Sequence, residues 1–209
     1  MTTYDLKAAE LLRLGAATLG EAGGHPLSPR IRAAWQGASI AAVVFTARCS
    51  PGDNLAIHVA VAEAPEAHAL LVDVGDEPEF GYWGEVLTVA AQARRLAGLV
   101  TNGCVRDTSA LRRLAFPVYS AGVALRGASK DRPGGVGGTV TIDGVDVAPG
   151  DWVVADGDGV TVVSSANLEG VVAAGHDRAT KEEVLLRELR AGATTLELLG
   201  LDEGRISRG

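Results

Sequence analysis

Two hydrophobic periodicities alternate over residues 69–119 and predict a parallel β-sheet covered by helices. Residues 69–74 and 99–101 are short apolar runs of the kind found in buried strands. Between them, apolar residues recur at helical spacing from Val86 to Leu96. A helix-like turn and a third apolar run, 116–119, follow. This alternation is typical of a parallel sheet, and ligands bind at the carboxyl ends of such strands.

The flanking segments have patterns of their own. Gly15 and Gly20 interrupt a helical pattern near the start of the chain, and Pro65 ends another. Asp-Gly and Pro-Gly pairs divide residues 139–163 into short runs without helical periodicity. The predicted elements are a helix over 4–23, a strand over 40–46, a helix over 55–64, a β-meander over 139–163 and an amphipathic C-terminal helix over 177–200.

Together these elements predict an α/β fold with one domain over residues 1–209. We expect a helical entry (1–37), a core (38–163) and the C-terminal helix. The core should form an α/β/β layered sandwich with a partly parallel sheet and a β-meander. A Rossmann fold is disfavoured because no G-x-G-x-x-G sequence leads from a strand into a helix. The glycine run at 134–138 leads into strands, so we interpret it as a loop rather than a phosphate cradle.

Composition and charge narrow the classes of partner. The chain has 209 residues and a net charge of −7, so it has no basic excess to bind nucleic acid. Its two cysteines, Cys49 and Cys104, are too few for a disulfide framework. The longest apolar run is shorter than the roughly 18 residues that a membrane span needs, and no leader pattern opens the chain. We therefore expect a cytoplasmic protein with neither a membrane nor a nucleic-acid partner.

The candidate chemistry is concentrated at the two ends of residues 84–107. Glu85 begins the predicted helix, where the backbone N–H groups of the first turn have no helical partner and can bind an anion. Arg106 offers a planar set of donors suited to a carboxylate. Asp107 offers the hard oxygen that Mg²⁺ prefers. An anion site, a guanidinium and a metal-type carboxylate together favour enolate chemistry on a keto acid.

Each of these residues also has a purely structural interpretation. Arg106 and Asp107 can begin a helix, with Asp107 as its cap and Arg106 in a surface ion pair. Glu85 can be an acid that favours the helix dipole. Asp53 and Asn54 fit turn and capping chemistry, and Asp156 and Asp158 lie in predicted turns. The four histidines show no ligand spacing, so the sequence assigns them no role.

The spacing Glu85, twenty residues, Arg106-Asp107 resembles the acid-x20-Arg-Asp motif of the class II pyruvate aldolases. These are the 4-hydroxy-4-methyl-2-oxoglutarate/4-carboxy-4-hydroxy-2-oxoadipate aldolases, in the superfamily shared with the RraA regulators of ribonuclease E. The resemblance covers about residues 38–163 in the same order. The other similar segments are Thr46–Leu55, Pro117–Gly122, Gly144–Asp151 and Ala155–Val160.

The resemblance implies cleavage of a 4-hydroxy-2-oxo acid to pyruvate and a second oxo acid, with oxaloacetate decarboxylation as a side activity. Asp107 would hold Mg²⁺ or Mn²⁺, and Arg106 would bind the enolate oxygen. Backbone N–H groups of Gly84, Glu85, Val86 and Leu87 would receive the carboxylate. Glu85 would orient the water that protonates the enolate. Glu85 replaces the usual Asp of these aldolases, and Asn102 replaces an Asp often found before the Arg-Asp pair.

The resemblance also implies a homotrimer or hexamer with active sites between subunits. A glutamate from the neighbouring subunit would then approach the metal, and Glu182 and Glu183 are the candidates in this chain. The sequence leaves two other functions open. One is a non-catalytic RraA-type regulator that binds ribonuclease E, and the other is a related lyase or decarboxylase acting on a different acid.

Overall fold

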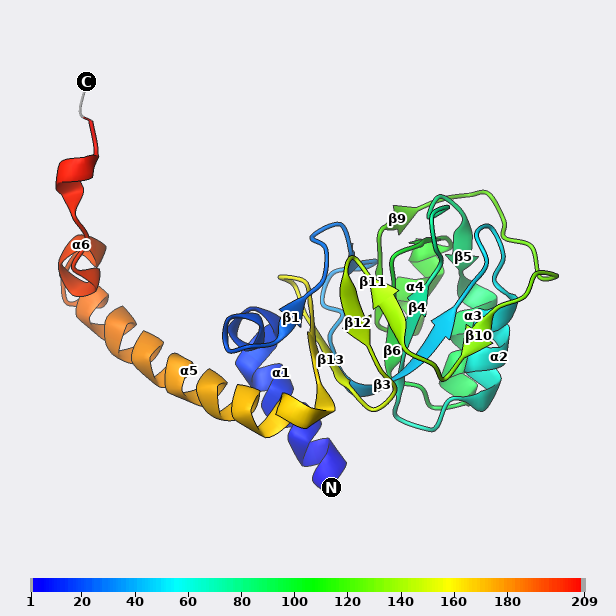
Figure 1. The fold of residues 1–209 in the computed structure, drawn as a ribbon, viewed down its shortest axis with the longest axis horizontal. Coiled ribbons are helices and arrows are strands. Elements are labelled where there is room, and N and C mark those ends of the chain that lie inside the picture. The colour runs from blue at the N-terminus through cyan, green and yellow to red at the C-terminus, as the bar shows by residue number, and fades with distance from the viewer. Residues whose placement is uncertain (1, 208–209) are drawn as a thin grey trace.

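A curled nine-stranded sheet organises the chain in a computed structural model that describes residues 2–207 (Figure 1). The strand order is β1-β14-β13-β3-β4-β6-β8-β2, and β10 pairs with the far end of β3. The strands of this sheet are β1 (His25–Pro26), β2 (Arg32–Ala33), β3 (Ile40–Arg48), β4 (Ala69–Asp73), β6 (Gly98–Thr101), β8 (Val118–Ser120), β10 (Gly135–Val136), β13 (Trp152–Ala155) and β14 (Val160–Val163).

The parallel part of the sheet comprises β3, β4, β6 and β8, as the apolar runs predict. Its connections are the helices α2 (Leu55–Glu63), α3 (Glu85–Ala93) and α4 (Thr108–Leu114). The last of these strands begins at Val118 rather than at residue 116. Pro117 has no backbone N–H to donate, so it contributes only its carbonyl, which accepts from the Leu99 N–H.

Both faces of the parallel strands are covered, so their runs are continuously apolar. Leu70 and Leu99 pack with α2, α3 and α4 on one face. Leu71 and Val100 face the opposite way, toward a two-stranded ribbon of β11 (Val140–Ile142) and β12 (Val145–Val147). Helices, main sheet and ribbon form the predicted α/β/β layers.

The predicted meander consists of two hairpins that belong to different sheets. β13 and β14 extend the main sheet antiparallel to β3, whereas β11 and β12 form the separate ribbon. Asp143 and Gly144 join the ribbon strands, with φ of 52° and 82°. Positive φ at both positions is the geometry of a two-residue turn that matches the twist of the strands.

The first helix, α1 (Thr3–Glu21), is interrupted at Gly15, one of the two predicted break points. Gly15 has φ of 81°, and the next residue turns its N–H toward Asp156, whose carboxylate accepts it at 2.8 Å. The Thr161 hydroxyl donates to the Ala16 carbonyl at 2.8 Å. Strand β14 and the Asp156 turn therefore satisfy the backbone groups that the kink releases.

The C-terminal helix differs from its predicted bounds of 177–200. α5 (Leu168–Arg190) begins earlier, directly after a 3₁₀ turn (Ser165–Asn167), and ends before Gly192, whose φ is 103°. A separate short helix, α6 (Thr195–Leu199), and a second 3₁₀ turn (Glu203–Arg205) follow. Val171 and Val172 are buried in the cluster that includes α1, so the helix starts within the body of the protein. Figure 1 shows the later part of α5 extending away from that body.

A small parallel sheet of β5 (Gly81–Trp83), β7 (Cys104–Val105) and β9 (Gly122–Val123) was not predicted. Its strands are too short to show a period, yet they position the candidate site described below. Within residues 2–207, no helix combines the length and the apolar character that crossing a membrane requires.

Asp53 is the best satisfied buried charge near the parallel strands, with 2% of its surface exposed. Its carboxylate accepts hydrogen bonds from the Ser129 hydroxyl at 2.7 Å and from the backbone N–H groups of Leu55, Asp131 and Arg132 at 2.8, 2.7 and 3.1 Å. Burial alone would raise the pKa of Asp53, but these four hydrogen bonds together hold it well below its usual range. Asp53 therefore anchors the 129–132 loop to the start of α2.

We predict that Asp53→Asn lowers the free energy of unfolding at pH 7 by about 2–4 kcal/mol, because an amide nitrogen then faces backbone donors. The native pKa is depressed, so the carboxylate stabilises the fold above its unfolded pKa of 3.8 and loses this effect as pH falls below that value. The difference between wild type and variant in urea unfolding should thus shrink below about pH 4. Asp131→Asn, an exposed position on the same loop, is the matched control. A difference that stays constant down to pH 3 contradicts this account.

Candidate active site

A cavity of about 160 Å³ lies where the chain leaves the carboxyl ends of the parallel strands. Its lining comes from the start of α2, from β5 and the start of α3, from the end of β7, and from the loop that contains Lys130. The lining residues are Asn54, His58, Gly81, Tyr82, Trp83, Gly84, Val86, Leu87, Arg106, Asp107 and Lys130. Sites for drug-sized ligands occupy roughly 300–1,000 Å³, so this cavity suits a small metabolite.

The end of β7 fixes the positions of Arg106 and Asp107. The Arg106 backbone N–H donates to the Trp83 carbonyl at 2.8 Å and so continues the pairing of β7 with β5. Asp107 then adopts the left-handed conformation, with φ of 58°. Its carboxylate does not cap α4 but accepts a hydrogen bond from the Glu85 backbone N–H at 3.1 Å. Asp107 is therefore the N-cap residue of α4, as the structural interpretation has it, but its side chain makes no capping hydrogen bond.

Gly84 allows these two segments to approach each other. A Cβ atom at Gly84 would lie 2.4 Å from Asp107 Oδ2 and 3.2 Å from Arg106 Cγ. Gly81 plays a similar part, because a Cβ there would lie 3.0 Å from Arg106 Cδ. The Arg106 side chain crosses the two glycines, and its Nε lies 3.8 Å from Asp107 Oδ2. At both positions the neighbouring atoms leave no room for a side chain.

The first turn of α3 lies at the cavity, where the sequence predicts an anion site. The Glu85 backbone N–H donates to the Asp107 carboxylate. Val86 and Leu87 follow in the same turn, and their N–H groups have no partner within the helix. Both Val86 and Leu87 line the cavity. The positive end of the helix dipole and the guanidinium of Arg106 therefore face the same small space.

The carboxylate of Glu85 lies outside the cavity lining. It accepts a hydrogen bond from Arg113 Nη2 at 2.6 Å, across the gap between α3 and α4. Both side chains are about half exposed or more, and such surface pairs contribute only about 0–1 kcal/mol. The structure therefore places the Glu85 backbone next to the cavity and its side chain against the last turn of α4.

Asn54 and His58 are cavity residues to which the sequence assigned no binding role. Asn54 is only 5% exposed, and its Nδ2 donates to the Tyr82 carbonyl at 2.8 Å. Asn54 Oδ1 and His58 Nε2 are both buried without a hydrogen-bond partner. Burial, reinforced by the positive charge of Lys130, lowers the pKa of His58, so its imidazole is neutral at pH 7. Their spacing of four residues at the start of a helix was the available signal in the sequence.

The possible metal ligands of this cavity suit a hard cation that keeps most of its water better than a cation held by protein ligands alone. Among residues 2–207, no group of three or more His, Cys, Asp and Glu side chains is placed to hold a metal ion. Asp107 contributes one partly exposed carboxylate at the cavity. Mg²⁺ keeps several waters and binds through one or two carboxylates together with substrate oxygens, which this arrangement permits. A structural zinc site, with four protein ligands, does not fit.

The glutamates considered for an intersubunit role lie far from this cavity in their own chain. Glu182 pairs with Arg178 at 3.1 Å on α5, and Glu183 is its exposed neighbour. Figure 1 shows α5 on the opposite side of the molecule from α3. Cys104, on β7, is half-buried, and burial raises the pKa of its thiol, so it is not an activated nucleophile.

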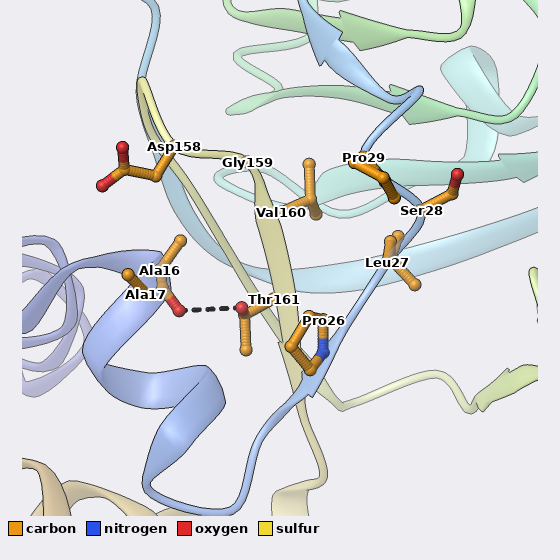
Figure 2. Close-up of a pocket in the computed structure, with 10 residues that line it drawn as sticks. All are labelled: Ala16, Ala17, Pro26, Leu27, Ser28, Pro29, Asp158, Gly159, Val160 and Thr161. Carbon is orange, nitrogen blue, oxygen red and sulfur yellow. Dashed lines mark hydrogen bonds between the residues drawn. The ribbon is translucent and has the colours of Figure 1, made fainter. Parts of the chain in front are cut away.

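A second cavity, of about 300 Å³, lies between α1 and β14 (Figure 2). Its walls are mostly apolar, from Ala16 and Ala17 on one side to Pro26 and Val160 on the other. The Thr161 hydroxyl is already bonded to the Ala16 carbonyl. We assign no chemistry to this cavity, because it brings together no set of convergent polar groups.

Comparison with known proteins gives a match to one family model and to several named relatives. Residues 15–162 match the RraA-like family, described as Aldolase/RraA. A protein of Burkholderia multivorans, provisionally named a 4-hydroxy-4-methyl-2-oxoglutarate aldolase, is 31% identical over 164 residues, which are 78% of this chain and 96% of that protein. A protein of Halalkalibacterium halodurans with the same provisional name is 31% identical over 127 residues. In that case the match spans 61% of this chain and only 60% of the relative.

The fold has a solved counterpart in Streptomyces coelicolor RraAS2, described as an unusual member of the RNase ES inhibitor RraA protein family. The two structures superpose with a TM-score of 0.75 at 26% identity, over 86% of this chain and 94% of that one. The family match covers well over half of the chain and includes all the residues that line the cavity. The chain belongs to the Aldolase/RraA family of RraA-like proteins.

Proposed function

We propose that this protein is a divalent-metal-dependent lyase that cleaves a 4-hydroxy-2-oxo acid to pyruvate and a second oxo acid. Oxaloacetate decarboxylation is the proposed side activity, because it passes through the same pyruvate enolate. The observation that carries the proposal is the convergence of the α3 N-terminus, Arg106 and Asp107 on one small cavity. The aldolase names of relatives at 31% identity support the same reaction.

Binding of the substrate begins with its carboxylate. Backbone N–H groups of Val86 and Leu87 receive it at the positive end of α3, with Gly84 and Glu85 shaping the turn. Lys130 and Arg106 are the cationic lining residues, so the cavity favours an anion. Arg106 is then placed to donate to the 2-oxo oxygen of the bound acid.

Cleavage of the C3–C4 bond sends its electron pair toward the 2-oxo group and leaves negative charge on that oxygen. The C4 hydroxyl loses its proton to water as it becomes the carbonyl of the second oxo acid, and the enolate carbon later takes up one proton from water, so the protons balance. Arg106 stabilises this charge, and such fixed donors typically contribute about 2.7–4 kcal/mol each to catalysis. Asp107 would hold Mg²⁺ or Mn²⁺ with its carboxylate, the remaining positions being filled by water and substrate. When bound, the cation supplies further positive charge near the same oxygen.

The enolate carbon must then receive a proton to release pyruvate. We assign the positioning of the proton-delivering water to Glu85, whose carboxylate would have to turn from Arg113 toward the cavity. Its exposed pair with Arg113 is weak enough to exchange for a water. Arg113 thereby sets how much of the time Glu85 turns toward the cavity.

We also propose an oligomeric state and a cellular location for this protein. Several apolar side chains of the C-terminal arm are exposed, among them Val184 at 46% and Leu199 at 54%. Val86, at the cavity rim, is 78% exposed. Covering such residues by neighbouring subunits would stabilise a cytoplasmic homotrimer or hexamer and would shield the site from water.

A second candidate function is protein-binding regulation without catalysis. The similarity to a structure described within the RNase ES inhibitor RraA family supports it. Binding of a purified ribonuclease E-type enzyme, with no pyruvate release from any oxo acid, would favour this function over the lyase.

The direct test is pyruvate release from oxaloacetate and from 4-hydroxy-4-methyl-2-oxoglutarate, with Mg²⁺ and with a chelator. We predict release that depends on the metal, and a loss of at least about 100-fold in kcat/KM for Asp107→Ala, since the metal-holding carboxylate is removed. Asp177→Ala, an exposed aspartate on α5, is the matched control and should keep wild-type rates. Full turnover by Asp107→Ala would refute the assignment.

Gly84→Ala tests the close approach at the site. Its Cβ would meet Asp107 Oδ2 at 2.4 Å and push the carboxylate aside, so we predict a loss of roughly 10- to 100-fold in kcat/KM. Gly138→Ala, where an added Cβ has no atom within 4 Å, should leave kcat/KM unchanged. Thermal unfolding of both variants checks that the fold is intact. Wild-type kinetics in folded Gly84→Ala would show that the Asp107 position is not critical.

A further inference from the structure

Asn54 Oδ1 and His58 Nε2 are the only buried side-chain nitrogen or oxygen atoms without a hydrogen-bond partner among residues 2–207, and both belong to the cavity lining. We propose that Asn54 and His58 form a subsite that binds the 4-hydroxyl group of the substrate. This inference rests on the proposed lyase function and names the group that its substrate must carry.

The orientation of the Asn54 amide is fixed by its other contact. Its Nδ2 donates to the Tyr82 carbonyl at 2.8 Å, and a carbonyl can only accept. Rotation of the amide by 180° would place two acceptors against each other, so Oδ1 must face the remaining direction. Asn54 is 95% buried. Its Oδ1 therefore offers an acceptor to a group that carries a hydrogen.

His58 supplies the complementary group. It lies one helical turn after Asn54, which is the N-cap of α2, so the two side chains are neighbours on one face of the helix. The charged groups that act on the imidazole are Lys130 on the loop and Asp53 before the helix. A neutral imidazole carries one N–H, and with that hydrogen on Nε2 the pair offers one donor and one acceptor.

A hydroxyl group matches this pair with a single atom. It donates its hydrogen to Asn54 Oδ1 and accepts from the His58 Nε2–H. A carboxylate or a ketone has no hydrogen for Asn54, so either would leave a buried acceptor unpaired at a cost in affinity. Sites built around a substrate hydroxyl discriminate strongly against analogues that lack it. An ordered water has the same hydrogen-bonding pattern and is the alternative occupant.

The subsite lies in the same cavity as the proposed anion site of α3, and Gly84 and Leu87 line that cavity as well. A 4-hydroxy-2-oxo acid carries its carboxylate and its hydroxyl on opposite sides of the bond that breaks. Helices α3 and α2 would then bind the two ends of that bond, with Arg106 at the 2-oxo group between them. Oxaloacetate, which lacks the hydroxyl, would use only the α3 half.

The test compares kcat/KM for 4-hydroxy-4-methyl-2-oxoglutarate and for oxaloacetate in wild type, His58→Leu and His58→Gln. His58→Leu removes the donor, and we expect the ratio of the two kcat/KM values to fall roughly 30- to 100-fold, mainly through KM for the hydroxy acid. His58→Gln keeps an N–H donor and should recover at least a tenth of the wild-type ratio. Oxaloacetate turnover in each variant reports that the fold and the enolate site are intact.

An unchanged ratio in His58→Leu would overturn the subsite and leave an ordered water as its occupant. An equal loss for both substrates would also overturn it, because His58 would then serve the enolate site or the fold. If wild type releases pyruvate from neither substrate, the proposed lyase function fails and this inference fails with it. A changed ratio beside retained oxaloacetate turnover is the one result that supports the subsite.

Discussion

The hydrogen bond from the Glu85 backbone N–H to the Asp107 carboxylate joins two consecutive strand–helix units of the parallel sheet. It satisfies a donor at the start of α3, and it holds the one carboxylate of the cavity in place. The bond requires a glycine at position 84, because a Cβ there would lie 2.4 Å from the accepting oxygen. One backbone constraint therefore determines both the geometry at the start of α3 and the position of the Asp107 carboxylate.

The cavity is completed by elements held in place at a distance. Asp53 binds the 129–132 loop through a hydroxyl and two backbone N–H groups, and this brings Lys130 to the lining. The Tyr82 hydroxyl accepts from Gly52 N–H at 2.8 Å, while its carbonyl accepts from Asn54. Strand β5, although only three residues long, therefore connects the α2 and α3 halves of the site. The same contacts that stabilise this edge of the sheet also orient its polar groups.

Local patterns in the sequence were sufficient for most of the framework. Apolar periodicity predicted β4, α3 and β6, and the glycine-containing turns predicted the hairpins, because these depend on neighbouring residues. The family resemblance is confirmed by the match over residues 15–162. The C-terminal helix was misplaced because its start depends on the packing of Val171 and Val172 against α1, which no local pattern records. Strands of two or three residues, such as β7 and β9, carry too few positions to show a period.

Less of the candidate site than of the framework could be predicted from the sequence. The spacing of Glu85, Arg106 and Asp107 anticipated the segments that meet at the cavity, whereas the pairing of Glu85 with Arg113 was not anticipated. Asn54 and His58 could be identified as candidate binding residues only from the structure. The Tyr82 carbonyl, distant in sequence, fixes the Asn54 amide, and one buried atom of each residue has no partner. Long-range contacts of this kind decide which polar residues of a chain face a ligand.

Calorimetric titration with oxalate, a planar dianion with the shape of the pyruvate enolate, tests directly whether this cavity binds an enolate. We predict binding that requires Mg²⁺ or Mn²⁺ and that weakens by at least about tenfold in Arg106→Ala, since the guanidinium contact to the enolate oxygen is lost. Arg178→Ala, on the C-terminal helix, should bind as wild type does. Oxalate binding that is absent, or that is indifferent to both the metal and Arg106, would contradict an enolate site in this cavity.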